Sequence, residues 1–202
     1  SESEKGVFPT FFDLLDILPG VIEESHYSKD TQSDYVGALC TRVKSLTNGI
    51  YGSVFCAEDA LSDAELFDCN VVVDLSRVGS METKSLLMGI LVMKLQEYRM
   101  CGSEMNSRLR HVTVLEEAHN LLRKTSAEQS QEGANLQGKS VEMLANAIAE
   151  MRTYGEGFII ADQAPGLLDM SVIRNTNTKI ILRLPDEEDR KLVGKSAALK
   201  EA

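Results

Sequence analysis

Two adjacent carboxylates follow a short apolar run that is typical of a buried strand. Residues 111–115 read His-Val-Thr-Val-Leu, and Glu116 and Glu117 come directly after them. A carboxylate at the end of a buried strand is costly to desolvate unless a positive charge compensates it. A magnesium ion could supply that charge, with Glu116 helping to hold the ion and Glu117 polarising a water molecule. The alternative is a helix that begins at Glu117, since acidic residues are favoured near a helix N-terminus.

Gln163 and Arg152 are two further polar residues beside predicted elements. Gln163 follows the apolar run 158–161, where it could contact a phosphate or orient a water molecule. It could equally satisfy the backbone of the turn before Pro165. Arg152 comes near the end of a predicted helix, a place where arginine usually complements the helix dipole. In a ring assembly the same arginine could reach a phosphate bound to a neighbouring subunit.

Residues 133–140 match the phosphate-loop pattern G-x-x-x-x-G-K-[ST] letter for letter. A working phosphate loop needs a buried strand before it and a helix N-terminus after it. The preceding residues, 125–132, are polar and cannot form a buried strand. We therefore interpret the match as a coincidence in which Ser140 caps the following helix. The alternative is a rearranged nucleotide site that uses Lys139 and Ser140.

Strands and helices alternate through the second part of the chain. β-branched and apolar runs predict four strands, at 71–74, 111–115, 158–161 and 179–184. Apolar residues at helical spacing predict helices at 82–99 and 141–151, a polar loop is expected at 124–139, and one or two short helices at 186–202. Alternating strands and helices indicate an α/β fold with a parallel sheet flanked by helices. Because chemistry gathers at the carboxyl ends of such strands, polar residues placed just after an apolar strand are the most informative about function.

The first part of the chain is predicted to be helical. One helix spans 11–18, capped by Thr10 and ended by Pro19-Gly20, and a second spans 35–46, ended by Asn48-Gly49. A polar stretch, 23–34, separates the two helices, and the acidic residues 57–68 are expected to form a loop. We therefore divide the chain into a mainly helical segment, 1–69, and an α/β core, 70–202.

The composition excludes several functional classes for this chain. The chain has 202 residues and a formal net charge of −10, which argues against a module that binds nucleic acid over its whole surface. No apolar run is long enough to span a bilayer. The four cysteines form no C-x-x-C pair, which predicts reduced thiols and no zinc site. The expected location is the cytoplasm.

Four segments in order resemble the HerA-type branch of the HerA/FtsK ATPases. They are Val-Leu-Glu-Glu-Ala-His at 114–119, Met-Arg-Thr-Tyr-Gly-Glu-Gly at 151–157, Ile-Ile-Ala-Asp-Gln-Ala-Pro at 159–165 and Asn-Thr-Asn-Thr-Lys-Ile-Ile-Leu-Arg-Leu at 175–184. The match extends over about 70–193. The resemblance implies an incomplete RecA-like P-loop NTPase sheet preceded by a helical insertion.

The same resemblance implies an activity and the residues that perform it. The family's members are hexameric, ATP-driven DNA translocases or helicases that contact DNA through pore loops and often work with a nuclease. Glu116 would occupy the magnesium-associated Walker B position, Glu117 would be the catalytic glutamate and Gln163 the γ-phosphate sensor. Arg152 would be an arginine that can act across a subunit boundary. This interpretation requires Glu117, Arg152 and Gln163 to converge on one pocket that cleaves a triphosphate. The implied cofactors are ATP and Mg²⁺.

The chain departs from the family pattern at two places. Glu116 stands where the family usually has aspartate, and residues 1–69 contain no phosphate loop. We therefore hypothesise that this is the carboxyl-terminal part of a longer ATPase, and that ATP binding by the isolated chain is too weak to measure by calorimetry. Residues 124–139 are a candidate pore or interface loop.

Two other functions remain open at this point. One is a nucleotide-independent scaffold that keeps the fold and docks on a partner ring. The retained polar groups of Glu117, Arg152 and Gln163 argue against it, because such groups are costly to bury without a use. The other is an ATPase of the related conjugation type, which has similar motifs.

Overall fold

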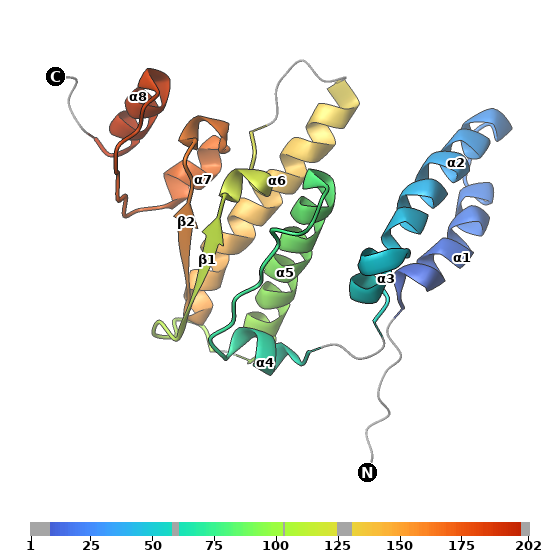
Figure 1. The fold of residues 1–202 in the computed structure, drawn as a ribbon, viewed down its shortest axis with the longest axis horizontal. Coiled ribbons are helices and arrows are strands. Elements are labelled where there is room, and N and C mark those ends of the chain that lie inside the picture. The colour runs from blue at the N-terminus through green and yellow to red at the C-terminus, as the bar shows by residue number, and fades with distance from the viewer. Residues whose placement is uncertain (1–8, 58–60, 103, 125–130, 199–202) are drawn as a thin grey trace, which may run out of the picture. The chain divides into compact units, whose positions relative to one another are not determined.

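The computed structural model describes residues 9–57, 61–102, 104–124 and 131–198, with only the backbone course given for 131–138. The chain divides into two compact units, with the boundary in the sequence between Leu61 and Ser62 (Figure 1). This division lies several residues before the expected one at 69/70, because the short helix after Ser62 belongs to the second unit. Each unit is described by itself.

The first unit consists of three helices: α1 (Phe11–Glu23), α2 (Lys29–Leu46) and α3 (Gly49–Phe55). Thr10 caps α1 in a capping box with Asp13, as its place before the apolar run predicts. The expected end at Pro19-Gly20 is wrong, since Pro19 lies inside the helix. Proline removes only one helical hydrogen bond, and the packing of α1 along α2 holds the remaining turn.

The second helix begins earlier than its apolar spacing predicts. Ser28 caps it and accepts a hydrogen bond from the Thr31 backbone N–H. The amide of Gln32 donates to the carbonyl oxygens of Glu23 and Ser25 at 3.2 and 2.9 Å, so the polar start of α2 is tied to the end of α1. The helix therefore includes polar residues from Lys29 onward, ahead of the apolar residues whose spacing predicts it.

The second unit is mixed α/β. Its helices are α4 (Asp63–Phe67), α5 (Met81–Gly102), α6 (Gln131–Met151), α7 (Met170–Asn175) and α8 (Glu187–Ser196). Its strands are β1 (His111–Glu116) and β2 (Glu156–Ala161), and its 3₁₀ turns are η1 (Ala118–Asn120), η2 (Arg152–Tyr154) and η3 (Pro165–Leu167). The two strands pair in parallel, with His111 opposite Glu156 and Glu116 opposite Ala161. The helix α6 runs from the carboxyl end of β1 back to the amino end of β2 (Figure 1).

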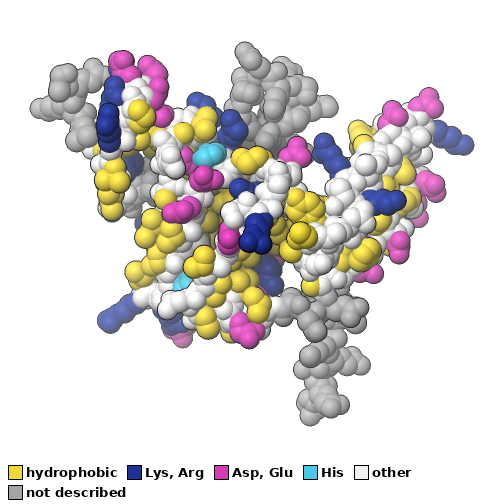
Figure 2. All heavy atoms as spheres, viewed as in Figure 1, with side chains coloured by type: hydrophobic (Ala, Val, Ile, Leu, Met, Phe, Trp, Pro, Cys, Tyr) yellow, Lys and Arg dark blue, Asp and Glu magenta, His cyan; other side chains and the backbone are white. Residues whose placement is uncertain are grey.

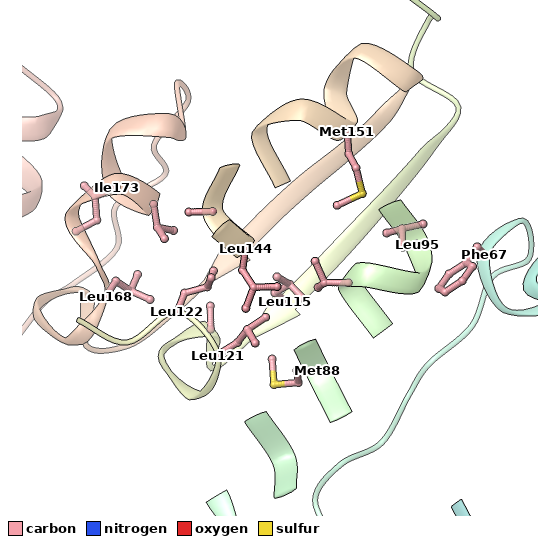
Figure 3. Close-up of a cluster of buried hydrophobic side chains, with 14 residues drawn as sticks. Phe67, Met88, Leu95, Leu115, Leu121, Leu122, Leu144, Met151, Leu168 and Ile173 are labelled. Atoms are coloured by element: carbon pink, nitrogen blue, oxygen red, sulfur yellow. The ribbon is translucent and has the colours of Figure 1, made fainter. Parts of the chain in front are cut away.

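The core of this unit lies between the sheet and the helices α5 and α6. Strand side chains alternate, so Leu115 and its neighbours on one face point inward while the opposite face stays exposed. Figure 3 shows buried side chains of α4, α5, α6, β1 and the segments after both strands meeting in one cluster. Its labelled members are Phe67, Met88, Leu95, Leu115, Leu121, Leu122, Leu144, Met151, Leu168 and Ile173.

Two of the four expected strands do not form. Residues 71–74 and 179–184 are in neither strand nor helix, and the apolar side chains there are open to solvent, with Val72 92% and Ile180 88% exposed. An apolar run needs a neighbouring strand to complete a ladder, and the described part of the chain offers none beside these two segments. The coarse α/β class is confirmed, whereas a wider nucleotide-binding sheet is not.

Three other expectations can be compared with the structure. The acidic segment 57–68 contains α4, because Ser62 and Glu65 form a capping box where only a loop was expected. All four cysteines are free thiols. Among the helices of the described ranges, none combines the length and the apolar content that a membrane crossing requires.

Candidate functional site

The carboxyl ends of β1 and β2 bring the two predicted polar segments side by side. Because Glu116 pairs in register with Ala161, the residues that follow, Glu117 and Asp162, leave neighbouring strands at the same level. Glu117 has a φ of 48° and a ψ of 47°, the left-handed region. This conformation is uncommon for a residue with a side chain, and it persists only where the surroundings enforce it. The alternative of a helix that begins at Glu117 is met only by the short 3₁₀ turn η1, which begins at Ala118 directly after Glu117.

A histidine and an aspartate hold the two strand ends together. The backbone N–H of His119 donates to Asp162 Oδ2 at 2.8 Å, and its ring Nδ1 lies 2.9 Å from the same oxygen. A carboxylate can only accept, so Nδ1 carries the proton. The Asp162 side chain is 3% exposed. The tie therefore fixes the end of β1 against the end of β2.

The Gln163 side chain is not used to close the turn after β2, so it is available to a ligand. The turn after β2 is closed by Asp162, whose Oδ1 accepts the Ala164 N–H at 2.8 Å. The sequence alternative, in which Gln163 itself satisfies this turn, is wrong. The Gln163 side chain is exposed at the same edge of the sheet as Glu117. Both residues can reach a ligand that sits over the strand ends.

Glu116 is exposed at the end of β1, on the open face of the sheet. Within the described ranges no three His, Cys, Asp or Glu side chains are grouped as a metal cage. Mg²⁺ does not require such a cage, because proteins usually hold it through one or two carboxylates together with substrate phosphates and water. An accessible carboxylate at this place fits that kind of coordination.

Asn120 is a neighbour of Glu117 that the sequence did not point to. Its amide nitrogen lies 3.4 Å from Glu117 Oε2, a long hydrogen bond. Its amide oxygen is buried and finds no donor in the described part of the chain. The amide nitrogen of Asn120 therefore contacts the candidate catalytic carboxylate, while its amide oxygen has no partner among the described residues.

Arg152 does not join Glu117 and Gln163. It is the first residue of η2 and precedes β2, whereas Glu117 and Gln163 follow β1 and β2. The strands separate the two positions by about 20 Å. The expected convergence of all three side chains on one pocket of a single chain is wrong. Arg152 is exposed at the amino end of the sheet.

A buried charge network lies at this amino end. Glu156 accepts hydrogen bonds from Arg99 Nε at 2.9 Å, His111 Nδ1 at 2.8 Å and Thr113 Oγ1 at 2.7 Å. Arg99 also donates to Asp68 Oδ1 at 2.7 Å. All members of this network were missed by the sequence, because they come from segments far apart in the chain.

The contacts of Asp68 and Arg99 shift the pKa values of both groups. The hydrogen bond from the Tyr98 hydroxyl and the contact with Arg99 lower the pKa of Asp68. Burial lowers the pKa of Arg99, but its hydrogen bonds to Asp68 and Glu156 outweigh that effect and raise it. The acid and the base thus hold each other in their charged forms.

The phosphate-loop pattern at 133–140 lies within α6. A phosphate cradle needs a loop whose backbone N–H groups point at the ligand, whereas helix N–H groups are already bonded within the helix. The coincidence is therefore confirmed, and the rearranged nucleotide site at Lys139 and Ser140 loses its structural basis. Ser140 lies inside the helix and is not its cap. The expected loop 124–139 is helical from Gln131, and residues 125–130 lie outside the described ranges.

Comparison of this chain with protein-family models, with curated proteins and with solved structures gave no match. The geometry of the strand ends and the motif resemblance are therefore the observations that bear on the function of this chain.

Proposed function

We propose that this chain is the carboxyl-terminal part of an ATP-hydrolysing DNA translocase or helicase of the HerA type. The observation that carries the proposal is the placement of Glu117 and Gln163 beyond the ends of adjacent parallel strands, tied through His119 and Asp162. Ligands of open parallel sheets bind outside the carboxyl ends of the strands. A base and an amide at that edge suit the hydrolysis of a triphosphate.

Each residue at this edge has a chemical task in the proposal. Glu117 accepts a hydrogen bond from the attacking water and orients it, and its left-handed backbone turns the side chain away from the line of the strand. Gln163 donates to an oxygen of the terminal phosphate. Glu116 helps to hold Mg²⁺, which neutralises charge on the phosphates.

The uncovered side of the sheet supports the idea that further chain completes the site. Val112, Val114 and Ile159 are 41, 56 and 54% exposed on one face of the two strands. Figure 2 shows hydrophobic side chains gathered over this face. Parallel strands are normally covered on both faces, so this side suits an additional layer. In the proposal, that layer brings the phosphate loop that residues 1–69 lack.

The position of Arg152 favours action between subunits. In one chain it is separated from Glu117 by the length of the sheet, but in a ring it can face the strand ends of its neighbour. A homohexamer whose pore loops contact DNA, often together with a nuclease, is the assembly that we propose. The net charge of −10 is compatible with DNA contact that is confined to a pore.

The test is ATP turnover by the parent protein, meaning the longer product of the same gene, with and without duplex DNA. We expect a strand followed by G-x-x-x-x-G-K-[ST] upstream of Ser1, ATP hydrolysis, and faster hydrolysis with DNA. A parent protein that contains no phosphate loop and hydrolyses no ATP would instead be a scaffold, and the proposal would be wrong.

A further inference from the structure

Asn120 and Glu117 lie at the two ends of the same short turn. The turn η1 is closed by the Asn120 backbone N–H, which donates to the Glu117 carbonyl oxygen at 2.9 Å. Side chains three residues apart are eclipsed in a 3₁₀ turn, so these two side chains share one face. The amide nitrogen of Asn120 reaches Glu117 Oε2 at 3.4 Å. Both the backbone and the side chain of Asn120 therefore contact the candidate catalytic residue.

The residues on both sides of Asn120 are anchored. His119, before it, is hydrogen-bonded to the buried Asp162 through its backbone N–H and its ring. Leu121 and Leu122, after it, are 5 and 0% exposed and belong to the hydrophobic core (Figure 3). The backbone of Asn120 is thus fixed between a polar tie and the core, so its side chain has little freedom to leave the turn.

The contact with Glu117 sets the orientation of the Asn120 amide. In the observed orientation the amide nitrogen points to Glu117, and the amide oxygen is buried without a donor among the described residues. Turning the amide over would place its oxygen against a carboxylate oxygen, and two acceptors repel each other. A buried acceptor without a donor lowers the stability of the fold. A residue that weakens the fold in this way is typical of a functional site.

We propose that Asn120 is a positioning residue that orients the Glu117 carboxylate for the hydrolytic step. This inference rests on the proposed function. The Asn120 amide engages Oε2, which leaves Oε1, without a partner in the described part of the chain, to accept a hydrogen bond from the attacking water. The 3.4 Å contact is long, as catalytic contacts often are before the substrate binds. Without this contact an exposed carboxylate samples several rotamers, and few of them suit the reaction.

The first test is ATP turnover by the parent protein carrying Asn120→Leu, which removes the amide and keeps the approximate size of the side chain. We expect kcat to fall about tenfold and the KM for ATP to change less than about twofold, because Asn120 acts on Glu117 and not on the substrate. The control Asn146→Leu makes the same change at an exposed position of α6 and is expected to keep the full rate. A wild-type rate in the Asn120→Leu protein would overturn the inference.

A double variant shows whether Asn120 acts through Glu117. In a parent protein that already carries Glu117→Gln, hydrolysis is measured in a single turnover with labelled ATP. Adding Asn120→Leu to this protein is expected to cause less than about a twofold further loss, because the carboxylate that Asn120 orients is already gone. A further loss as large as in the wild-type background would show that Asn120 acts independently of Glu117, and the inference would be wrong.

Stability separates positioning from a purely structural role. In urea denaturation of the 202-residue chain, Asn120→Leu is expected to be at least as stable as the wild type, because it removes the unpaired buried acceptor. Asn120→Asp places a second carboxylate beside Glu117 and is expected to be less stable. Both variants are expected to lower turnover in the parent protein. If only the less stable variant lost turnover, Asn120 would have a structural role and the inference would be wrong.

A measurement without ATP tests the contact itself. In the ¹⁵N-labelled chain, the resonance of the Asn120 side-chain amide is identified by its loss in Asn120→Leu. Glu117→Ala is expected to shift this resonance more than Glu116→Ala, which removes the adjacent carboxylate, and equal shifts would contradict the contact. A parent protein that hydrolyses no ATP overturns the proposed function together with the role of Asn120 in hydrolysis. A wild-type rate with Asn120→Leu overturns this inference alone.

Discussion

At the scale of single residues, Asp162 makes more of the hydrogen bonds that hold the candidate site together than its exposed neighbours do. Its buried carboxylate accepts two hydrogen bonds from His119 and one from the Ala164 N–H. These three bonds hold the backbone on either side of the strand ends and so fix the positions of Glu117 and Gln163. Asp162 is a positioning residue, since it acts on the site through His119 and the turn.

Asp162→Asn is expected to destabilise the chain by about 1–3 kcal/mol, because an amide replaces one acceptor and leaves buried N–H groups unpaired. The measurement is the free energy of unfolding from urea denaturation. Glu97→Gln, at an exposed residue whose side chain has no partner within the described ranges, is the control and should change little. Equal stability of both variants would show that the tie between the strand ends is not needed.

Asp68 makes stability depend on pH. Its pKa is lowered by the Tyr98 hydrogen bond and by Arg99, so the folded state binds the proton less readily than the unfolded state. The resulting stability is present above the unfolded pKa of aspartate, near 4, and is lost as the pH falls through the lower folded pKa. We expect Asp68→Asn to be less stable than the wild type at pH 7 and to approach it below about pH 4. An unchanged difference between pH 7 and pH 3 in denaturation curves would contradict this.

At the scale of elements, the buried Glu156 joins β2 to α5 and β1. It receives hydrogen bonds from Arg99, His111 and Thr113 and has no exposed side-chain area. Removing one partner of a buried ion pair leaves the other charge uncompensated. The network therefore sets how α5 sits on the amino end of the sheet.

Glu156→Gln is expected to cost about 3–5 kcal/mol of unfolding free energy. The double variant with Arg99→Met should lose less than the sum of the two single variants, because the uncompensated guanidinium is then gone. Thermal and urea unfolding of the four proteins give this coupling. Strictly additive losses would show that the two side chains do not stabilise each other.

The sequence predicted those helices and strands that are marked by a pattern within their own residues. Strands β1 and β2 and helices α5 and α6 follow from apolar periodicity, and Thr10 marks the first helix. Segments 71–74 and 179–184 have equally good strand composition, but a strand forms only beside a partner. The site was predictable in part for the same reason. Glu117 and Gln163 follow strands directly, whereas the contacts of Asp162 and Glu156 depend on three-dimensional pairing.

At the scale of the whole molecule, the two ends of one small sheet carry different chemistry. The carboxyl end presents Glu116, Glu117 and Gln163, and the amino end presents arginines. In the proposed ring, the acidic edge of one copy would face the basic edge of the next, and the two charges are complementary. The proposal assigns Arg152 to hydrolysis only through such an arrangement.

The most direct test of the central claim is ATP hydrolysis by the parent protein carrying Glu117→Gln. Glutamine keeps the size of the side chain but cannot accept a proton from the attacking water. We predict a loss of at least about 100-fold in turnover with ATP binding retained, while Glu142→Gln, at an exposed position of α6, keeps the full rate. Wild-type turnover by the Glu117→Gln protein would contradict the assignment of this edge of the sheet as a hydrolytic site.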